Sequence, residues 1–206
     1  LIKANKHFGS IKDSTNRNCS TYDNTMLAML SEDLEVLPLD NPFKGHDIKG
    51  AIKEHLWSGT YFYDDMHRAE VVTGDSNVFP FWTGIFTDEN MIKSAVREIQ
   101  EAVLDDPFPL KYSNEKVSKE LFWRKWFVSE YQTNSIKTHM GALYIHVVNE
   151  IEPKLGKSYI DAYTKIIEDH GTYLENFTAE GKPLKTRFYY SDEGNLWAAN
   201  YLTFFK

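Results

Sequence analysis

Apolar residues recur at three- and four-residue intervals along most of the chain, and this spacing predicts one helix after another. The clearest stretch is 87–104, where Thr87 can cap the helix, two acidic residues follow, and an apolar stripe runs from Met91 to Leu104. Seven further stretches show helical patterns: 20–37, 47–57, 76–86, 121–135, 138–155, 158–171 and 194–205.

Cap and turn residues indicate where these helices start and stop. Ser20 or Thr21 is a suitable N-cap for the first helix, and Pro80 suits the first turn of the third. Gly171 follows the seventh helix, where a glycine can adopt the left-handed conformation that ends a helix. These local signals agree with the apolar spacing, so both predict the same succession of helices.

Two short stretches, 59–65 and 185–194, have a β-like composition. The regular alternation of strands and helices that is typical of a parallel sheet is missing from the sequence. We therefore expect residues 1–206 to form a single all-α domain of about seven or eight helices, with small β pieces at helix ends.

The helical stretches differ in how apolar they are. Residues 76–86 and 138–148 are apolar nearly all round, whereas 90–104 and 158–170 are amphipathic. Alternation of buried inner helices with half-exposed outer helices indicates a two-layer α/α toroid. A globular helix bundle would show the same contrast, so this pattern leaves both arrangements open.

Charge and composition bear on partners and location. Lys and Arg number 23 against 30 Asp and Glu, and this net charge of −7 argues against nucleic acid or an anionic membrane as a partner. No apolar run approaches the roughly 18 residues needed to span a membrane. The single cysteine, Cys19, excludes an internal disulfide and a cysteine-rich zinc site. We expect a cytoplasmic protein without a metal or a cofactor.

Carboxylates among aromatic or amide residues at helix ends are the candidate chemical groups. Glu175 is the most informative, because Tyr173, Leu174, Asn176 and Phe177 surround it just after a helix end. It is either a structural group paired with nearby Lys or Arg or one member of a catalytic pair, such as the two carboxyl groups of a glycoside hydrolase. The others are Asp13, Asp23, Asp64, Asp65, Asp75, Asp192 and Glu193, of which Asp75 and Asp192 look like helix caps.

Four stretches together carry a resemblance to a known class of enzymes. They read IKDSTNRNCSTYDNTML (11–27), IKEHLWSGTYFYDD (52–65), GDSNVFPFWTGIF (74–86) and HGTYLENFTAEGKPLKTRFYYSDEGNLWAANYL (170–202). From Asp13 onwards the chain resembles the C-terminal half of (α/α)6-barrel glycoside hydrolases, which include trehalase-like, glucosidase-like and glycogen-debranching enzymes. Residues 133–146 match a part that is usually rich in Trp but here contain none.

The resemblance implies a reaction and a site. It implies hydrolysis of an α-glycosidic bond with inversion, with Glu175 as the general base and Asp13 as the acid, on an oligosaccharide or glycoside. It also implies a partial (α/α)6 toroid that another part of the polypeptide or a second subunit would complete. The substrate contacts expected at the helix ends are Asp23, Asn24, Trp57, Tyr61, Asp75, Asn77, Trp82, Tyr190 and Trp197.

Two other functions fit the same sequence. A non-catalytic all-α domain could bind a carbohydrate or a protein through an aromatic cleft; the 15% aromatic content fits either a cleft or a large core. A polysaccharide lyase would need a Tyr or His base and a basic subsite, which the acidic balance of the chain disfavours. The position of the acid relative to Glu175 separates hydrolysis from binding alone.

Overall fold

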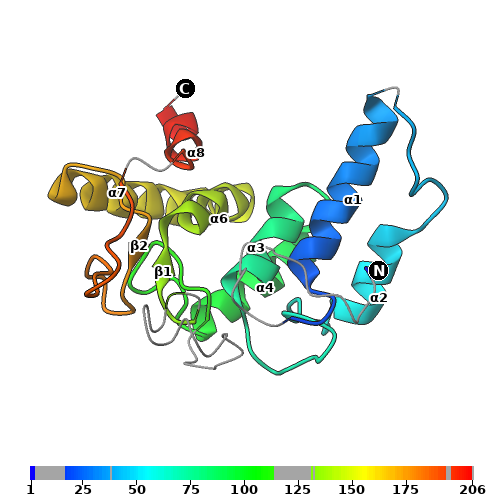
Figure 1. The fold of residues 1–206 in the computed structure, drawn as a ribbon, viewed down its shortest axis with the longest axis horizontal. Coiled ribbons are helices and arrows are strands. Elements are labelled where there is room, and N and C mark those ends of the chain that lie inside the picture. The colour runs from blue at the N-terminus through cyan, green and yellow to red at the C-terminus, as the bar shows by residue number, and fades with distance from the viewer. Residues whose placement is uncertain (3–16, 38, 114–130, 132, 194–195, 206) are drawn as a thin grey trace.

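The computed structural model describes residues 1–2, 17–37, 39–113, 131, 133–193 and 196–205. These residues are mostly helical, which confirms the predicted all-α class (Figure 1). A two-stranded antiparallel ladder pairs Ile136 with Phe177 and Lys137 with Asn176. The elements are α1 (Thr21–Val36), α2 (Ile48–Leu56), α3 (Gly74–Trp82), α4 (Glu89–Glu101), β1 (Ile136–Lys137), α6 (Thr138–Ile151), α7 (Pro153–His170), β2 (Asn176–Phe177), α8 (Ala198–Leu202) and a 3-10 turn (Thr203–Phe205).

Short-range hydrogen bonds explain most helix ends. The Ser20 side chain accepts a bond from the Asp23 backbone N–H, and Gly171 ends α7 with a φ of 66°, which confirms both predicted ends. The prediction for α4 was off by one residue, because Asp88 rather than Thr87 caps the helix with its carboxylate. The predicted helix over 121–135 lies largely outside the described residues.

Helix α3 starts earlier than the sequence pattern indicated. It begins at Gly74, so Pro80 stands near its C-terminal end rather than in its first turn, and the helix ends at Trp82. The Gly74 N–H donates to the Tyr112 carbonyl oxygen at 2.8 Å. A Cβ on Gly74 would lie 2.5 Å from the Lys111 carbonyl oxygen, so this close approach requires glycine.

Helix α3 packs against both α1 and α6 (Figure 1). Helix α2 packs against α1, α7 packs against α6, and α4 packs against both α3 and α6. Residues 74–81 of α3 are all buried, as is most of α6, whereas α7 buries Gly156 and Tyr163 along its 18 residues. The predicted contrast between buried and amphipathic helices is therefore confirmed. Among the helices of the described residues, none combines the length and apolar character needed to cross a membrane.

The N-terminal ends of α1, α3 and α6 lie at one end of the molecule, because the loops beside them bond to one another. The Thr21 N–H donates at 3.0 Å to the carbonyl oxygen of Asp64, which lies in the loop between α2 and α3. The Lys137 N–H, just before α6, donates to the Leu110 carbonyl oxygen at 2.8 Å, close to the residue that binds Gly74. Polar side chains from distant parts of the chain therefore gather at this end.

Candidate active site

Glu175 lies at the N-terminal end of α6, held there by its backbone. Its N–H donates to the Asp192 carbonyl oxygen at 2.9 Å. Its carbonyl oxygen accepts from the Thr138 N–H at 3.2 Å and from the Thr138 hydroxyl at 3.0 Å. The first residue of α6 and the segment after α7 thus fix Glu175 from two sides.

Two tyrosine hydroxyls hold the carboxylate of Glu175. The Tyr131 hydroxyl donates to Oε1 at 3.0 Å, and the Tyr189 hydroxyl donates to Oε2 at 3.1 Å. The side chain is half-buried. The alternative of a structural ion pair is wrong for the part of the chain described here, where neither lysine nor arginine pairs with Glu175. Lys185 and Arg187 instead lie over the rings of Tyr190 and Phe188.

Both tyrosines stay protonated over the physiological pH range. Burial raises the pKa of Tyr131 to about 12, and the negative charge of Glu175 adds to this effect. Burial also raises the pKa of Tyr189, again with a contribution from Glu175. Each hydroxyl is therefore a neutral hydrogen-bond donor.

Replacing Glu175 by Gln is expected to lower the pKa of Tyr131 from about 12 toward its ordinary value of 10.0, because a charge that disfavours the phenolate is removed. The pKa should stay above 10.0, since burial persists. Titration followed by NMR of Cζ-labelled tyrosine, with Tyr131→Phe to assign the signal, measures the change. Tyr61 is the internal control, because burial and charges other than Glu175 raise its pKa. Equal titration of Tyr131 in both proteins would contradict the contact.

A buried lysine and a buried side-chain amide contact the two tyrosines. The Lys137 side chain is 1% exposed, and its ammonium donates to Oδ1 of Asn176. The Asn176 amide Nδ2 donates to the Tyr189 hydroxyl oxygen at 2.6 Å. The Lys137 ammonium also lies 3.4 Å from the centre of the Tyr131 ring. The sequence indicated Asn176 as a neighbour of Glu175, but it did not indicate Tyr131, Lys137 or Tyr189 as site residues.

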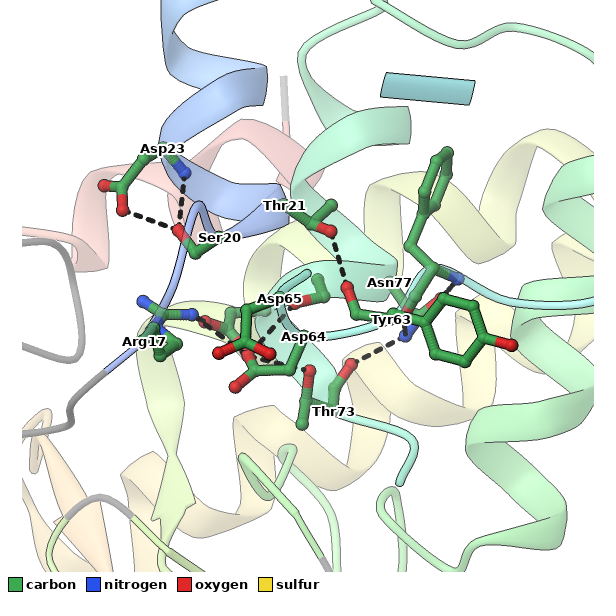
Figure 2. A network of polar contacts seen from close by, with 12 residues as sticks. Arg17, Ser20, Thr21, Asp23, Tyr63, Asp64, Asp65, Thr73 and Asn77 are labelled. Atoms are coloured by element: carbon green, nitrogen blue, oxygen red, sulfur yellow. Dashed lines mark hydrogen bonds and ion pairs between the residues drawn. The ribbon is translucent and has the colours of Figure 1, made fainter. Parts of the chain in front are cut away.

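A second polar cluster lies at the N-terminal ends of α1 and α3. Arg17 is bonded to Asp64 at 3.1 Å and to Asp75 at 2.8 Å. Figure 2 shows Arg17, on the segment that leads into α1, turned toward Asp64 in the loop before α3. Burial opposes the charge on Arg17, but Asp64 and Asp75 outweigh burial and raise the pKa of the guanidinium. The predicted cap role of Asp75 is wrong, because Asp75 lies inside α3 and its carboxylate binds Arg17.

Tyr112 lies within electrostatic reach of both clusters. It is fully buried, and burial raises the pKa of its hydroxyl well above the ordinary value. The charges that act on this hydroxyl include Asp75 and Arg17 from the second cluster and Glu175 from the first. Tyr112 is thus the buried residue whose pKa responds to charges from both clusters.

The two residues expected as contacts at the start of α1, Asp23 and Asn24, differ in burial. Asp23 is half-buried, and burial raises the pKa of its carboxyl even though the Ser20 hydroxyl donates to it at 2.5 Å. Asn24 is fully buried, and its amide donates to the Ser20 carbonyl oxygen at 2.7 Å and to the Cys19 sulfur at 3.3 Å. Asp13 lies outside the described residues.

The other expected contact residues also divide by burial. Asn77 is fully buried and bonds to the Phe62 N–H and carbonyl oxygen, so its amide joins loop to helix. Tyr190 is half exposed. The remaining four are partly buried with ring neighbours: Trp57 on Phe62, Tyr61 on Tyr63, Trp82 on Phe79 and Trp197 on His139.

His139 adds a neutral group beside Trp197. It stands in the first turn of α6, and the two ring centres are 5.1 Å apart. Burial, aided by the charge of Lys137, lowers the pKa of His139 to about 3, so the imidazole is uncharged at neutral pH.

The described residues thus bring Glu175, Tyr131 and Tyr189 together. This end of the molecule can position a carboxylate and surround it with neutral donors and aromatic rings. In comparisons with known proteins, the chain matches no family model and no curated protein.

Proposed function

We propose that this chain belongs to a glycoside hydrolase that cleaves an α-glycosidic bond with inversion, on an α/α toroid of which these helices form a part. The observation that carries the proposal is the carboxylate of Glu175, half-buried between the Tyr131 and Tyr189 hydroxyls. The resemblance to (α/α)6-barrel hydrolases assigns Glu175 as the general base. The reaction needs no cofactor.

The hydrogen bonds of Glu175 suit the role of a base. A general base must be ionised and must keep a lone pair for the proton that it takes from water. Both tyrosine hydroxyls are protonated, so each donates a hydrogen bond to the carboxylate. Each carboxylate oxygen has about two acceptor positions, and each tyrosine occupies one. One position on each oxygen is left for a water molecule.

The acid of the proposed pair is Asp13. The resemblance to (α/α)6-barrel hydrolases assigns this role, and Asp13 lies outside the described residues. Inverting pairs stand about 6.5–9.5 Å apart, so the distance between the carboxyl groups of Asp13 and Glu175 tests the assignment.

The partly exposed residues at this end are the proposed sugar contacts. A sugar ring presents apolar faces that stack on aromatic rings and hydroxyls that bond to carboxylates. Asn24, Asp75 and Asn77 are fully buried in internal bonds, and we assign them to holding the helix ends. The residues that remain as contacts are Asp23, Trp57, Tyr61, Trp82, Tyr190 and Trp197.

The remaining helices of the toroid would come from another part of the same polypeptide or from a second subunit. Exposed apolar side chains on α1, such as Met29 and Leu30, support a further packing partner. A cytoplasmic location fits a chain with one cysteine, which is buried.

Product stereochemistry tests the proposal. The full polypeptide should be screened against α-linked glucosides and mannosides, and the first-formed sugar should be followed by proton NMR before mutarotation. We expect the β-anomer to appear first, because water attacks the face opposite the leaving group. An α-anomer would overturn the inverting mechanism. Binding of these sugars without turnover would instead favour a non-catalytic carbohydrate-binding domain.

A further inference from the structure

Lys137 determines which way the side-chain amide of Asn176 points. An ammonium group donates hydrogen bonds and cannot accept them, so the atom of Asn176 that faces Lys137 must be the oxygen Oδ1. If the amide turned by half a rotation, its NH2 group would face a buried positive charge. Because Lys137 is 1% exposed, water cannot take the place of the missing bond.

Backbone hydrogen bonds fix the position of Asn176, so only the orientation of its side-chain amide group can vary. The backbone N–H of Asn176 donates to the Ser191 hydroxyl at 2.8 Å, and the backbone carbonyl oxygen of Asn176 accepts from the Leu184 N–H at 3.1 Å. With Oδ1 turned toward Lys137, Nδ2 donates to the Tyr189 oxygen at 2.6 Å. The direction of the amide therefore determines the role of the Tyr189 oxygen as an acceptor.

Because Tyr189 accepts a hydrogen bond from Asn176, it donates its own proton to Glu175. A phenol has one proton, and its oxygen is already accepting from Asn176. Its proton is consequently donated to Oε2 of Glu175 at 3.1 Å. The order of donors runs from Lys137 through Asn176 and Tyr189 to the carboxylate, which stands at the accepting end.

We propose that Lys137 is a positioning residue that sets the hydrogen-bond direction of this Lys137–Asn176–Tyr189 relay, so that Glu175 is held as a proton acceptor. The catalytic consequence rests on the proposed function, because a carboxylate held in this way serves as a base and not as an acid. The direction of the relay itself is a property of the fold, and it is measurable without any substrate.

An NMR experiment on the protein tests the direction. In the wild type, the side-chain amide protons of Asn176 should show nuclear Overhauser contacts to the ring protons of Tyr189, with Tyr189→Phe used to assign the ring. The absence of these contacts would overturn the proposal without any need for a Lys137 variant. Lys137→Met should weaken or abolish them, because the amide is then able to turn its oxygen toward the tyrosine.

Two further variants distinguish a change in the direction of the hydrogen bonds from a general disturbance of the structure. Lys137→Arg keeps a donor-only cation and should restore the contacts between the amide and the ring. Lys165→Met removes an exposed lysine that pairs with Asp169 on α7, and it should leave them unchanged. Circular dichroism verifies that each variant is folded. Identical contacts in Lys137→Met and Lys165→Met would overturn the proposal.

Turnover measurements then test the consequence for Glu175. If the wild type hydrolyses a glycoside, Lys137→Met should lower kcat by about 10- to 100-fold with little change in KM, since a misdirected base affects chemistry more than binding. Lys137→Arg should recover most of the rate. A wild type that hydrolyses no glycoside would refute the proposed function, yet the NMR contacts would still decide the direction of the relay.

Discussion

Glu175→Gln is expected to lower the turnover number by about 1000-fold and to leave the protein folded. An amide has the shape of the carboxylate, but it cannot take a proton from water at neutral pH. The amide keeps one acceptor oxygen, so one of the two tyrosine hydroxyls can still donate to it, whereas the other faces the NH2 group and accepts a hydrogen bond from it. Initial rates on the best α-glycoside found in the screen, measured together with circular dichroism, verify both parts of the expectation.

The matched control is Glu150→Gln, which makes the same chemical change at an exposed position on α6. Its rate should stay within about twofold of the wild type, because surface substitutions of this kind rarely affect stability or chemistry. A full rate in Glu175→Gln would remove Glu175 from the mechanism. Equal losses in both variants would show that the change in charge, not the position, lowers the rate.

Arg17→Met is expected to lower the free energy of unfolding by about 3–5 kcal/mol, the range for breaking a buried ion pair from one side. Met fills similar space but cannot bond to Asp64 or Asp75. The carboxylate of Asp75 is fully buried, so its lost bond to Arg17 lies in a place where water cannot replace it. Urea unfolding followed by tryptophan fluorescence measures the loss.

Arg97→Met is the control for this variant, because Arg97 is exposed on α4. Its effect should be within about 0.5 kcal/mol of zero. A stability of Arg17→Met equal to that of the control would mean that the pairs with Asp64 and Asp75 do not hold the starts of α1 and α3 together. A large loss would show that Arg17 has a structural role in the stretch that the sequence analysis selected for Asp13.

The residues of the candidate site show where sequence reasoning reached its limit. Glu175 was recognised because its sequence neighbours alone place a carboxylate among aromatic residues just after a helix end. Tyr131 is 44 residues away from it in the chain, and Lys137 is 39 residues away from Asn176. Nothing in a single sequence marks such pairs, because their contact depends on how α6 and the segment after α7 pack.

The burial of Asp75 and Asn77 also depends on contacts between distant parts of the chain. Each was placed correctly near a helix start, and helix starts are common places for cleft residues. Their environment depends on Arg17, which is 58 residues from Asp75, and on the loop at Phe62. Packing buries both side chains, and their polar atoms form hydrogen bonds within the protein.

The sequence by itself determined the all-α class, the buried and amphipathic characters of the helices, and helix ends such as Ser20 and Gly171. These features depend on apolar spacing and on hydrogen bonds within a few residues, so a local pattern contains them. The tertiary structure alone decided that Glu175 lies between two tyrosines, with Lys137 behind them. Such a cluster forms when packing removes water from side chains distant in sequence, and each group then needs the others as hydrogen-bond partners.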